Sequence, residues 1–285
     1  RPLGRYQHMI TNRDQLIDAL ANNSTRIVID KASIANAAAG QYHSLWRATG
    51  QPGQGAIPTA AANCSQSTTG CLTFSQQTAP AKSYLAYLEA TNGISASTME
   101  VHDRLMHMGG LNGTLTTAQT VGIDFNGVTA DNMVERIGDA NYSDIQWGLE
   151  WYTDTGPAVA TATVAVTYND GTTGNLTGVS LAATRRASFT QPLNGLIPAA
   201  AAGKFIRAVN TVTLSASTGT AGNFGVTATR LRGTLFMPIA NAKFGADWAS
   251  LPINTIPNSA CPFIAVIAVT SSTGLLRGGG KIAHG

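Results

Sequence analysis

Apolar and polar residues alternate regularly in the part of the chain that follows residue 140. From 145 to 152 every second position is apolar, namely Ile145, Trp147, Leu149 and Trp151. A period of two is typical of a β-strand with one buried face. The pattern recurs over 162–168, and the Asn169-Asp170-Gly171 turn that follows is a strong hairpin signal. Further strands are predicted over 179–183, 205–216, 224–237 and 263–270, with the connector 217–223 as a hairpin loop.

The first 140 residues show a mixed pattern. After an N-cap at Thr11, apolar residues recur at helical spacing as far as Leu20, which predicts a helix. Residues 26–30 predict a short strand, and 33–39 predict a second helix that ends at Gly40.

Residues 48–81 are rich in Gly, Pro, Gln, Thr and Ser and show no periodicity. A segment of this kind is either a functional loop or an arm that a neighbouring subunit orders. Apolar character returns over 84–88 and 98–108 before Gly109-Gly110 breaks the chain again.

These patterns predict a mainly β protein in two parts. The first part, 1–140, is a mixed α/β region with one or two short helices and the extended loop or arm 48–81. The second part, 141–285, has strands divided by Gly, Pro and Asn turns and no long helical segment. We expect it to be an antiparallel β-sandwich of the jelly-roll-like kind.

Charge is scarce in this chain. Of its 285 residues 12% are charged and 44% are hydrophobic, and the net charge is +3, whereas a typical soluble domain is about 25% charged. The composition excludes a disordered chain and a coiled coil. Basic residues cluster only at Arg185-Arg186 and Arg230/Arg232, so no specific nucleic-acid partner is expected. Apolar runs are too short for a spanning helix, so no membrane association is expected.

Candidate chemistry is limited to one group of titratable residues, His102, Asp103 and His107. Metal ligands share a face at a spacing of i,i+4 on a helix or i,i+2 on a strand, and the two histidines fit neither. We therefore expect them to be hydrogen-bonded or exposed. Motifs for a nucleophile elbow, a phosphate loop or a zinc protease are absent from the sequence, and no carboxylate pair is singled out. We assign no catalytic residue, cofactor or metal site, and we do not expect an enzyme.

Cysteines and glycines offer two weaker signals. Cys64 and Cys71 lie in one polar loop and can pair, but with Cys261 they match no zinc spacing. Free thiols in a reducing compartment are the simpler interpretation. Gly278-Gly279-Gly280-Lys281 is similar to part of a phosphate loop but lacks its upstream Gly and its following Ser/Thr, so a flexible tail is predicted.

The low charge also favours an assembled protein. A surface of Ala, Thr and Gly can be covered by other subunits without desolvating ions, and the cores of protein interfaces are depleted in charge. This composition favours a lattice or ring component over a free monomer.

Four segments spread over the chain resemble structural proteins of tailed bacteriophages. They are YHSLWRATGQPG (42–53), HDRLMHMGGL (102–111), LEWYT (149–153) and VTLSASTGTAGNFGVT (212–227). The resemblance implies a virion structural protein, assembled in the host cytoplasm and associated with the capsid as a cement, decoration or minor capsid protein. The implied partners are copies of the same chain, in a trimer or ring, and a major capsid protein. No binding residues are carried over from the family.

Other functions remain as alternatives. The long spine helix of the usual tailed-phage major capsid protein is not predicted here, so a major capsid protein is an alternative, as is a head–tail connector or tail component. A carbohydrate-binding adhesin would use Trp147, Trp151 and Tyr152 near Glu150, although packing explains these residues better. A hydrolase would have to use His102, Asp103 and His107.

Overall fold

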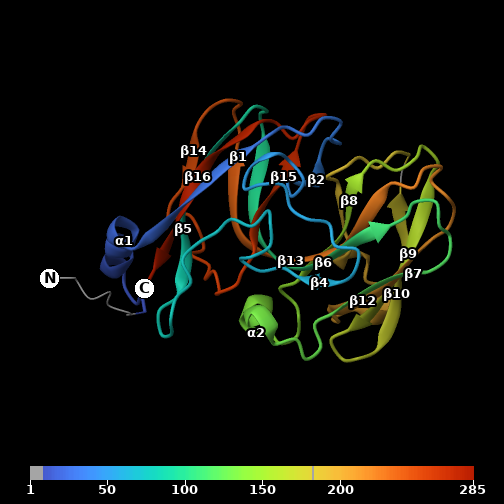
Figure 1. Ribbon diagram of the computed structural model, residues 1–285, viewed down its shortest axis with the longest axis horizontal. Coiled ribbons are helices and arrows are strands. Elements are labelled where there is room, and N and C mark those ends of the chain that lie inside the picture. The colour runs from blue at the N-terminus through green and yellow to red at the C-terminus, as the bar shows by residue number, and fades with distance from the viewer. Residues whose placement is uncertain (1–8, 182) are drawn as a thin grey trace.

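Antiparallel β-structure dominates the computed structural model, which describes residues 9–181 and 183–285 (Figure 1). The strands are β1 (Ser24–Lys31), β2 (Gln41–Ser44), β3 (Gly50–Gln51), β4 (Ala62–Asn63), β5 (Ser83–Asn92), β6 (Ser97–Leu111), β7 (Gln119–Asp124), β8 (Gln146–Thr153), β9 (Ala160–Tyr168), β10 (Thr173–Leu181), β11 (Thr190–Pro192), β12 (Ile206–Leu214), β13 (Asn223–Met237), β14 (Phe244–Ala246), β15 (Pro262–Ala268) and β16 (Leu276–His284). The helices are α1 (Arg13–Asn22) and α2 (Met133–Ile137), with 3₁₀ turns η1 (Ala130–Asn132), η2 (Asn194–Leu196) and η3 (Ala199–Ala201). Among the described residues no helix is both long and apolar enough to cross a membrane.

The strands form three sheets. The central sheet has the order β11-β8-β13-β6-β15-β2, with β4 also paired to β6. A four-stranded sheet has the order β10-β9-β12-β7, and a five-stranded sheet has the order β14-β5-β16-β1-β3. All of the strand pairs in the three sheets are antiparallel. The predicted fold class, mainly β and antiparallel, is therefore confirmed.

Two hydrophobic cores share the central sheet. Its strands β6 and β13 are 15 residues long each, so they extend through both cores. At one end Trp147 and Val226 pack with side chains of the four-stranded sheet such as Val164. At the other end Met99 and Leu235 pack with side chains of the five-stranded sheet. The strand register, with its bulges, places both cores on the same face of the central sheet, which we call the inner face.

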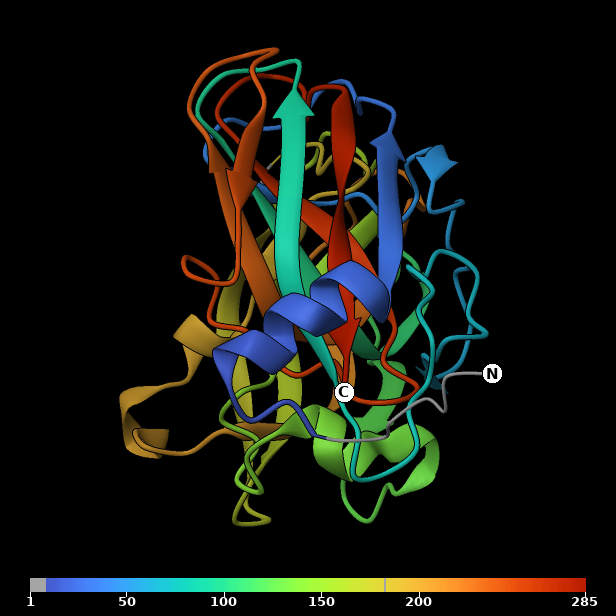
Figure 2. The same ribbon diagram turned by 90° about the vertical axis from the view of Figure 1, so that its left-hand side faces the viewer.

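The first helix and several strands follow the predictions. Helix α1 is present, but its N-cap is Asn12 and not Thr11, because the Asn12 side chain accepts a hydrogen bond from the backbone N–H of Gln15 at 2.9 Å. In Figure 2 the helix crosses the lower ends of β5, β16 and β1. The hairpin at Asn169-Asp170-Gly171 joins β9 to β10, and the backbone N–H of Gly171 donates to the carbonyl of Tyr168 at 3.0 Å.

The boundary that the sequence suggests near residue 140 does not separate the sheets. β6 pairs with β13, β1 pairs with β16, and β7 pairs with β12, so each of the three sheets combines strands from before and after that residue.

The helix predicted over 33–39 is wrong. Ala35 forms an isolated β-bridge with Ser272, and Asn36 has a left-handed backbone (φ 61°). The backbone N–H of Ile34 donates to the Thr273 hydroxyl at 2.9 Å, and the Thr273 N–H donates to the Ile34 carbonyl at 3.1 Å. Tertiary hydrogen bonds therefore override the local preference for a helix.

The hairpin predicted at 217–223 is also wrong, because β12 and β13 belong to different sheets. β12 already pairs with β9 on one side and with β7 on the other. The connector instead bonds to neighbouring loops: Thr218 N–H donates to the Gly113 carbonyl at 2.8 Å, and Ala158 N–H donates to the Thr218 carbonyl at 3.1 Å. It therefore crosses from one sheet to the other.

The predicted C-terminal tail is in fact a strand. Gly278 to Lys281 lie in β16, between β5 and β1 in the five-stranded sheet. A Cβ atom on Gly278 would lie 2.0 Å from the carbonyl oxygen of Glu89. The glycines therefore allow a close approach of neighbouring strands, and the prediction of a flexible tail is wrong.

The segment 48–81 is mostly irregular, as predicted, but its own chain orders it. Cys64, Leu72 and Phe74 are buried. The Cys64 N–H donates to the Leu105 carbonyl at 2.9 Å, and the Leu72 N–H donates to the Pro262 carbonyl at 2.8 Å. This segment does not need another subunit to hold it.

Candidate functional site

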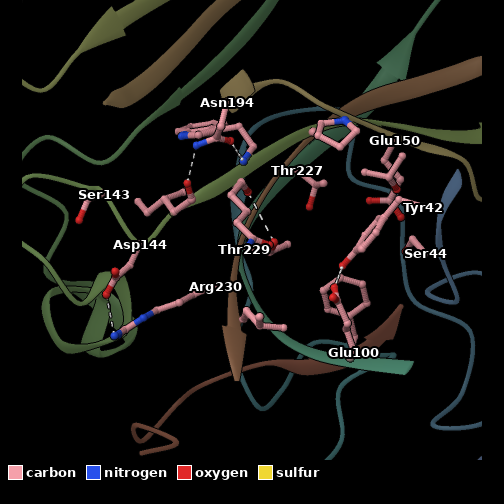
Figure 3. Close-up of a pocket in the computed structure, with 18 of the residues that line it drawn as sticks. Tyr42, Ser44, Glu100, Ser143, Asp144, Glu150, Asn194, Thr227, Thr229 and Arg230 are labelled. Atoms are coloured by element: carbon pink, nitrogen blue, oxygen red, sulfur yellow. Dashed lines mark hydrogen bonds and ion pairs between the residues drawn. The ribbon is translucent and has the colours of Figure 1, made fainter. Parts of the chain in front are cut away.

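A groove of about 730 Å³ lies on the central sheet, on the face opposite the two cores (Figure 3). We call this the outer face. Its lining comes from six strands of that sheet, β2, β6, β8, β11, β13 and β15, and from the loops beside them. In Figure 3 Tyr42 and Glu100 lie on one side of the groove, Asp144 and Arg230 lie on the other, and Thr227 and Thr229 lie between them.

Glu100 is held in place by two neighbours. Its Oε2 atom accepts a hydrogen bond from the Tyr42 hydroxyl at 2.9 Å and lies 2.8 Å from Nε2 of His102. The Tyr42 hydroxyl and the same His102 nitrogen are also in contact. Burial would raise the pKa of Glu100, but the hydrogen bond and charge of His102 and the Tyr42 hydroxyl hold it below its usual value. Glu100 is thus an ionised, oriented acceptor at neutral pH.

A buried ion pair lies next to the groove. Arg104 donates to both carboxylate oxygens of Glu150, at 2.6 and 3.0 Å, and both side chains are almost fully buried. Its guanidinium also lies 4.4 Å from the ring centroid of Trp46 and 4.2 Å from that of Phe263. Burial would lower the pKa of Arg104, but the charge of Glu150 raises it overall. The fork-to-fork geometry fixes both side chains.

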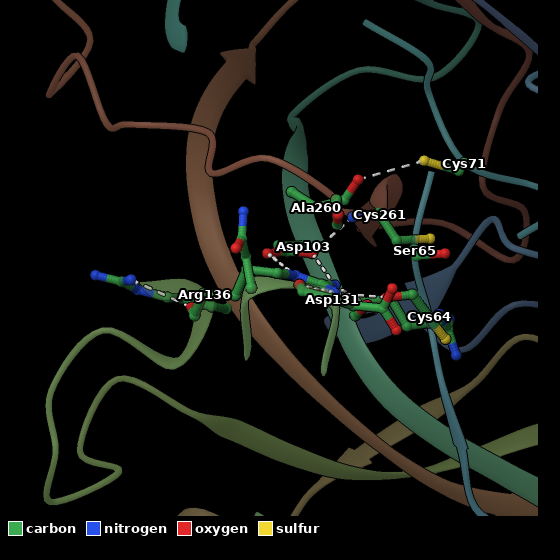
Figure 4. Close-up of polar contacts among 12 residues, drawn as sticks. Cys64, Ser65, Cys71, Asp103, Asp131, Arg136, Ala260 and Cys261 are labelled. Carbon is green, nitrogen blue, oxygen red and sulfur yellow. Dashed lines mark hydrogen bonds and ion pairs between the residues drawn. The ribbon is translucent and has the colours of Figure 1, made fainter. Parts of the chain in front are cut away.

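A second buried ionic cluster joins α2 to the central sheet (Figure 4). Asp103 accepts hydrogen bonds from Arg136 at 2.7 and 3.1 Å, from Arg232 at 3.0 Å and from the backbone N–H of Cys261 at 2.8 Å. Burial would raise the pKa of Asp103, but the two arginines and this N–H group lower it. All acceptor positions of the carboxylate are therefore occupied.

All three cysteines are free and buried. Cys64 and Cys261 pack in one small apolar cluster with Cys71 and Trp46. Burial raises the pKa of the Cys64 thiol well above its ordinary value, so this thiol is kept protonated. In the part of the chain that the structure describes, no group of three His, Cys, Asp or Glu side chains is placed to hold a metal ion.

The histidine group named from the sequence does not form one site. His102 bonds to Glu100, while Asp103, the next residue of the strand, bonds to the two arginines on the opposite side. His107 lies 3.2 Å from the Arg104 guanidinium, and burial lowers its pKa. All three side chains are buried, so of the two expected alternatives, hydrogen-bonded or exposed, the structure shows hydrogen-bonded histidines.

The aromatic residues named for a sugar-binding face are not available to a ligand. Trp147 and Trp151 belong to the core on the inner face, and Tyr152 packs beside Cys64 of the segment 48–81. β8 is buried on both faces, not on one face as the alternation predicted, because Glu150 pairs with Arg104.

No pattern in the sequence predicts this groove. Its free and half-buried groups come from Tyr42, Glu100, Gln146 and Asn254, which are far apart in the chain. The only local signal was the Glu100-x-His102 pair, at the i,i+2 spacing that puts two side chains on one face of a strand.

Comparisons with known proteins give little support for a family. No protein-family model and no curated protein matches the sequence. Among solved structures, the chain is similar to the infectious bursal disease virus VP2 subviral particle, with 10% identity, a TM-score of 0.18, and coverage of 92% of this chain and 79% of that one. The corresponding values for the Gx strain of that virus are 11%, 0.16, 98% and 85%. TM-scores this low do not establish a shared fold.

Proposed function

We propose that this chain is a structural component of a virus particle that assembles with copies of itself. In the finer form of the proposal it is a capsid-associated protein of a tailed bacteriophage, of the cement, decoration or minor capsid kind, and binds a major capsid protein. In this proposal it is not an enzyme and is located in the virion.

The observation that carries the proposal is a group of exposed apolar side chains at one end of the molecule. Phe236, Ile239, Val269 and Leu275 are 55, 61, 43 and 40% exposed. They lie at the ends of β13 and β15 and on the loops that follow, which meet the turn 92–96: Ala96 N–H donates to the Pro238 carbonyl and Gly93 N–H to the Leu275 carbonyl. Both views place these loops together at the top (Figures 1 and 2). Exposed apolar groups of this kind are typical of protein interaction sites.

The position of the four phage-like segments also supports a structural role. Segments 102–111 and 149–153 lie in β6 and β8, and segment 212–227 includes the first part of β13. Segment 42–53 contains most of β2 and also Trp46, which packs beside Cys64 and Phe263 on the outer face. All four segments therefore include residues of the central sheet, although 42–53 also contains β3 and 212–227 also contains the end of β12.

The first test is the oligomeric state of the purified chain, measured by size-exclusion chromatography with light scattering. We expect a trimer or larger ring, and we expect Ile239→Ser to shift it toward the monomer. Val159→Ser is the matched control, because Val159 is 67% exposed but directly precedes β9 in the four-stranded sheet. A wild-type monomer, or equal effects of the two changes, would contradict the proposal.

The second test addresses the place in the particle. Quantitative mass spectrometry of purified virions gives the copy number of the chain. A copy number in the hundreds supports capsid decoration, whereas a number that matches a single ring moves the protein to the neck or tail. Absence of the chain from purified virions would refute the virion role.

A further inference from the structure

The outer-face groove has the size and the floor of a binding site for a small polar ligand. Ligand sites usually enclose about 300–1,000 Å³, and the groove measures about 730 Å³. Its lining includes Gly148, which has no side chain, and in Figure 3 the short side chains of Thr227 and Thr229 lie between its two sides. The Thr227 hydroxyl accepts a hydrogen bond from Arg104 at 3.1 Å, and the Thr229 hydroxyl lies 3.3 Å from Nδ1 of His102. Short side chains therefore line the middle of the groove, and a ligand can lie across several strands.

Several polar groups of the lining have no hydrogen-bond partner among the described residues. Glu100 is bonded through Oε2 only, which leaves Oε1 unoccupied. Asn254 donates to the Arg232 carbonyl through Nδ2, which leaves its side-chain oxygen unoccupied. The side chain of Gln146 is exposed and makes no hydrogen bond with the described residues. The groove thus presents two acceptors and an amide, with Glu100 held in position by Tyr42 and His102.

The charges of the lining favour a neutral ligand. Asp144 is paired with Arg230 at 2.8 Å, and Glu150 is paired with Arg104. Glu100 contacts His102 at 2.8 Å and no guanidinium in the described residues, and its carboxylate would repel an anion. Beside it the ring of Tyr42 offers an apolar surface. These groups match the chemistry of a sugar. The carboxylate accepts hydrogen bonds from sugar hydroxyls, the amides both donate and accept hydrogen bonds, and the aromatic ring packs against the C–H faces.

We propose that this groove binds a neutral oligosaccharide, with Glu100 and Gln146 as hydrogen-bonding residues and Tyr42 as the apolar contact. The proposal does not depend on a virion role and uses none of the buried aromatic residues of β8.

The experiment uses the full chain on a glycan array that holds neutral, sialylated and amino oligosaccharides. Titration calorimetry then follows with the tightest neutral ligand and with spermidine as a cationic probe. We expect neutral glycans to be retained and spermidine not to bind. Glu100→Gln should weaken binding about tenfold to a hundredfold, because hydrogen bonds to charged groups are worth that much, and Gln146→Ala should weaken it about tenfold. Gln146 is exposed, so its replacement does not endanger the fold.

Glu89→Gln is the matched control. Glu89 also accepts a hydrogen bond from a tyrosine, Tyr87, but it lies on β5 in the five-stranded sheet, so its replacement should leave binding unchanged. Retention of no neutral glycan, a preference for sialylated glycans or spermidine, or unchanged affinity in both groove variants would overturn the proposal. An equal loss in the Glu89→Gln variant would overturn it as well. None of these outcomes bears on the oligomeric state, which tests the proposed function separately.

Discussion

Replacing Asp103 by asparagine removes the negative charge that the buried side chains of Arg136 and Arg232 share. Four N–H groups from these arginines and from the Cys261 backbone converge on its two oxygens at 2.7 to 3.1 Å. Asparagine keeps one oxygen but places an NH₂ group against donors at the other. Two guanidinium groups would then lie in the protein interior without a counter-charge.

The expected cost follows from that geometry. Removal of one partner from a buried ion pair costs about 3–5 kcal/mol, and domains of ordinary stability have only about 5–15 kcal/mol in total. We therefore expect Asp103→Asn to lower the free energy of unfolding by about 3–5 kcal/mol at pH 7. Urea unfolding followed by tryptophan fluorescence measures it, since Trp147 and Trp151 are buried in the core. Asp14→Asn is the control: its carboxylate is exposed, so a change below about 0.5 kcal/mol is expected.

The pH dependence offers an independent check on the same residue. The arginines hold the pKa of Asp103 below its usual value, so its stabilisation is complete above the unfolded pKa of about 3.9. It is lost as the pH falls through the lower, folded pKa. The stability difference between wild type and Asp103→Asn should therefore be constant from neutral pH to about 5 and narrow below about 4. A variant within about 1 kcal/mol of wild type at pH 7, or a difference that does not depend on acid, would refute this reasoning.

Three further predictions concern other parts of the fold. Gly278→Val should lower the free energy of unfolding by about 1–3 kcal/mol or more, because the valine side chain would meet the Glu89 backbone. Thermal unfolding measures the change, and an unchanged melting temperature would restore the flexible-tail interpretation. Burial lowers the pKa of Lys31 to about 8, so between about pH 8 and 10.5 the unfolded chain binds more protons than the folded chain. The free energy of unfolding of the wild type should therefore rise relative to that of Lys31→Met over this pH range. Urea titrations at several pH values that show no such rise would contradict this prediction. Trp151→Ala should cost about 3–5 kcal/mol in urea unfolding because Trp151 is a core residue, and a loss below about 1 kcal/mol would argue against that placement.

Local sequence patterns predict single strands and turns, but they do not predict which strands pair with one another. The alternation over 162–168 and the Asn169-Asp170-Gly171 turn identified β9 and its hairpin, because both depend on neighbouring residues. The connector 217–223 has the same kind of composition, yet β12 and β13 enter different sheets. Pairing of strands that lie far apart in the chain, such as β1 with β16, depends on contacts that no local pattern records.

The groove illustrates the same difficulty for a candidate site. Alternation over 145–152 assigns the polar position Glu150 to solvent. In the structure Glu150 is covered and paired with Arg104, while Glu100 remains at the edge of the groove. What separates the two residues is the segment that follows β2 and packs Trp46 over the outer face, and this cover comes from a part of the chain with no periodicity.

Several of the few charged residues of this chain form buried ion pairs at the central sheet. Among the described residues, the charged side chains that are almost fully buried are Lys31, Asp103, Arg104, Arg136, Glu150 and Arg232, so part of the small charge content of the sequence lies in the interior and not on the surface. Buried pairs add little net stability compared with apolar packing, but they can specify a unique arrangement. Asp103 and Arg104 lie on β6 between two bulges of its ladder with β13, at Ala228/Thr229 and Leu231/Gly233. Their partners Arg232 and Glu150 lie on the two strands next in the order, β13 and β8. A slip of β6 by one residue would turn Arg104 toward the apolar core and leave Glu150 unpaired. These few charges therefore set the register of β6, β13 and β8, which the bulges alone would leave ambiguous.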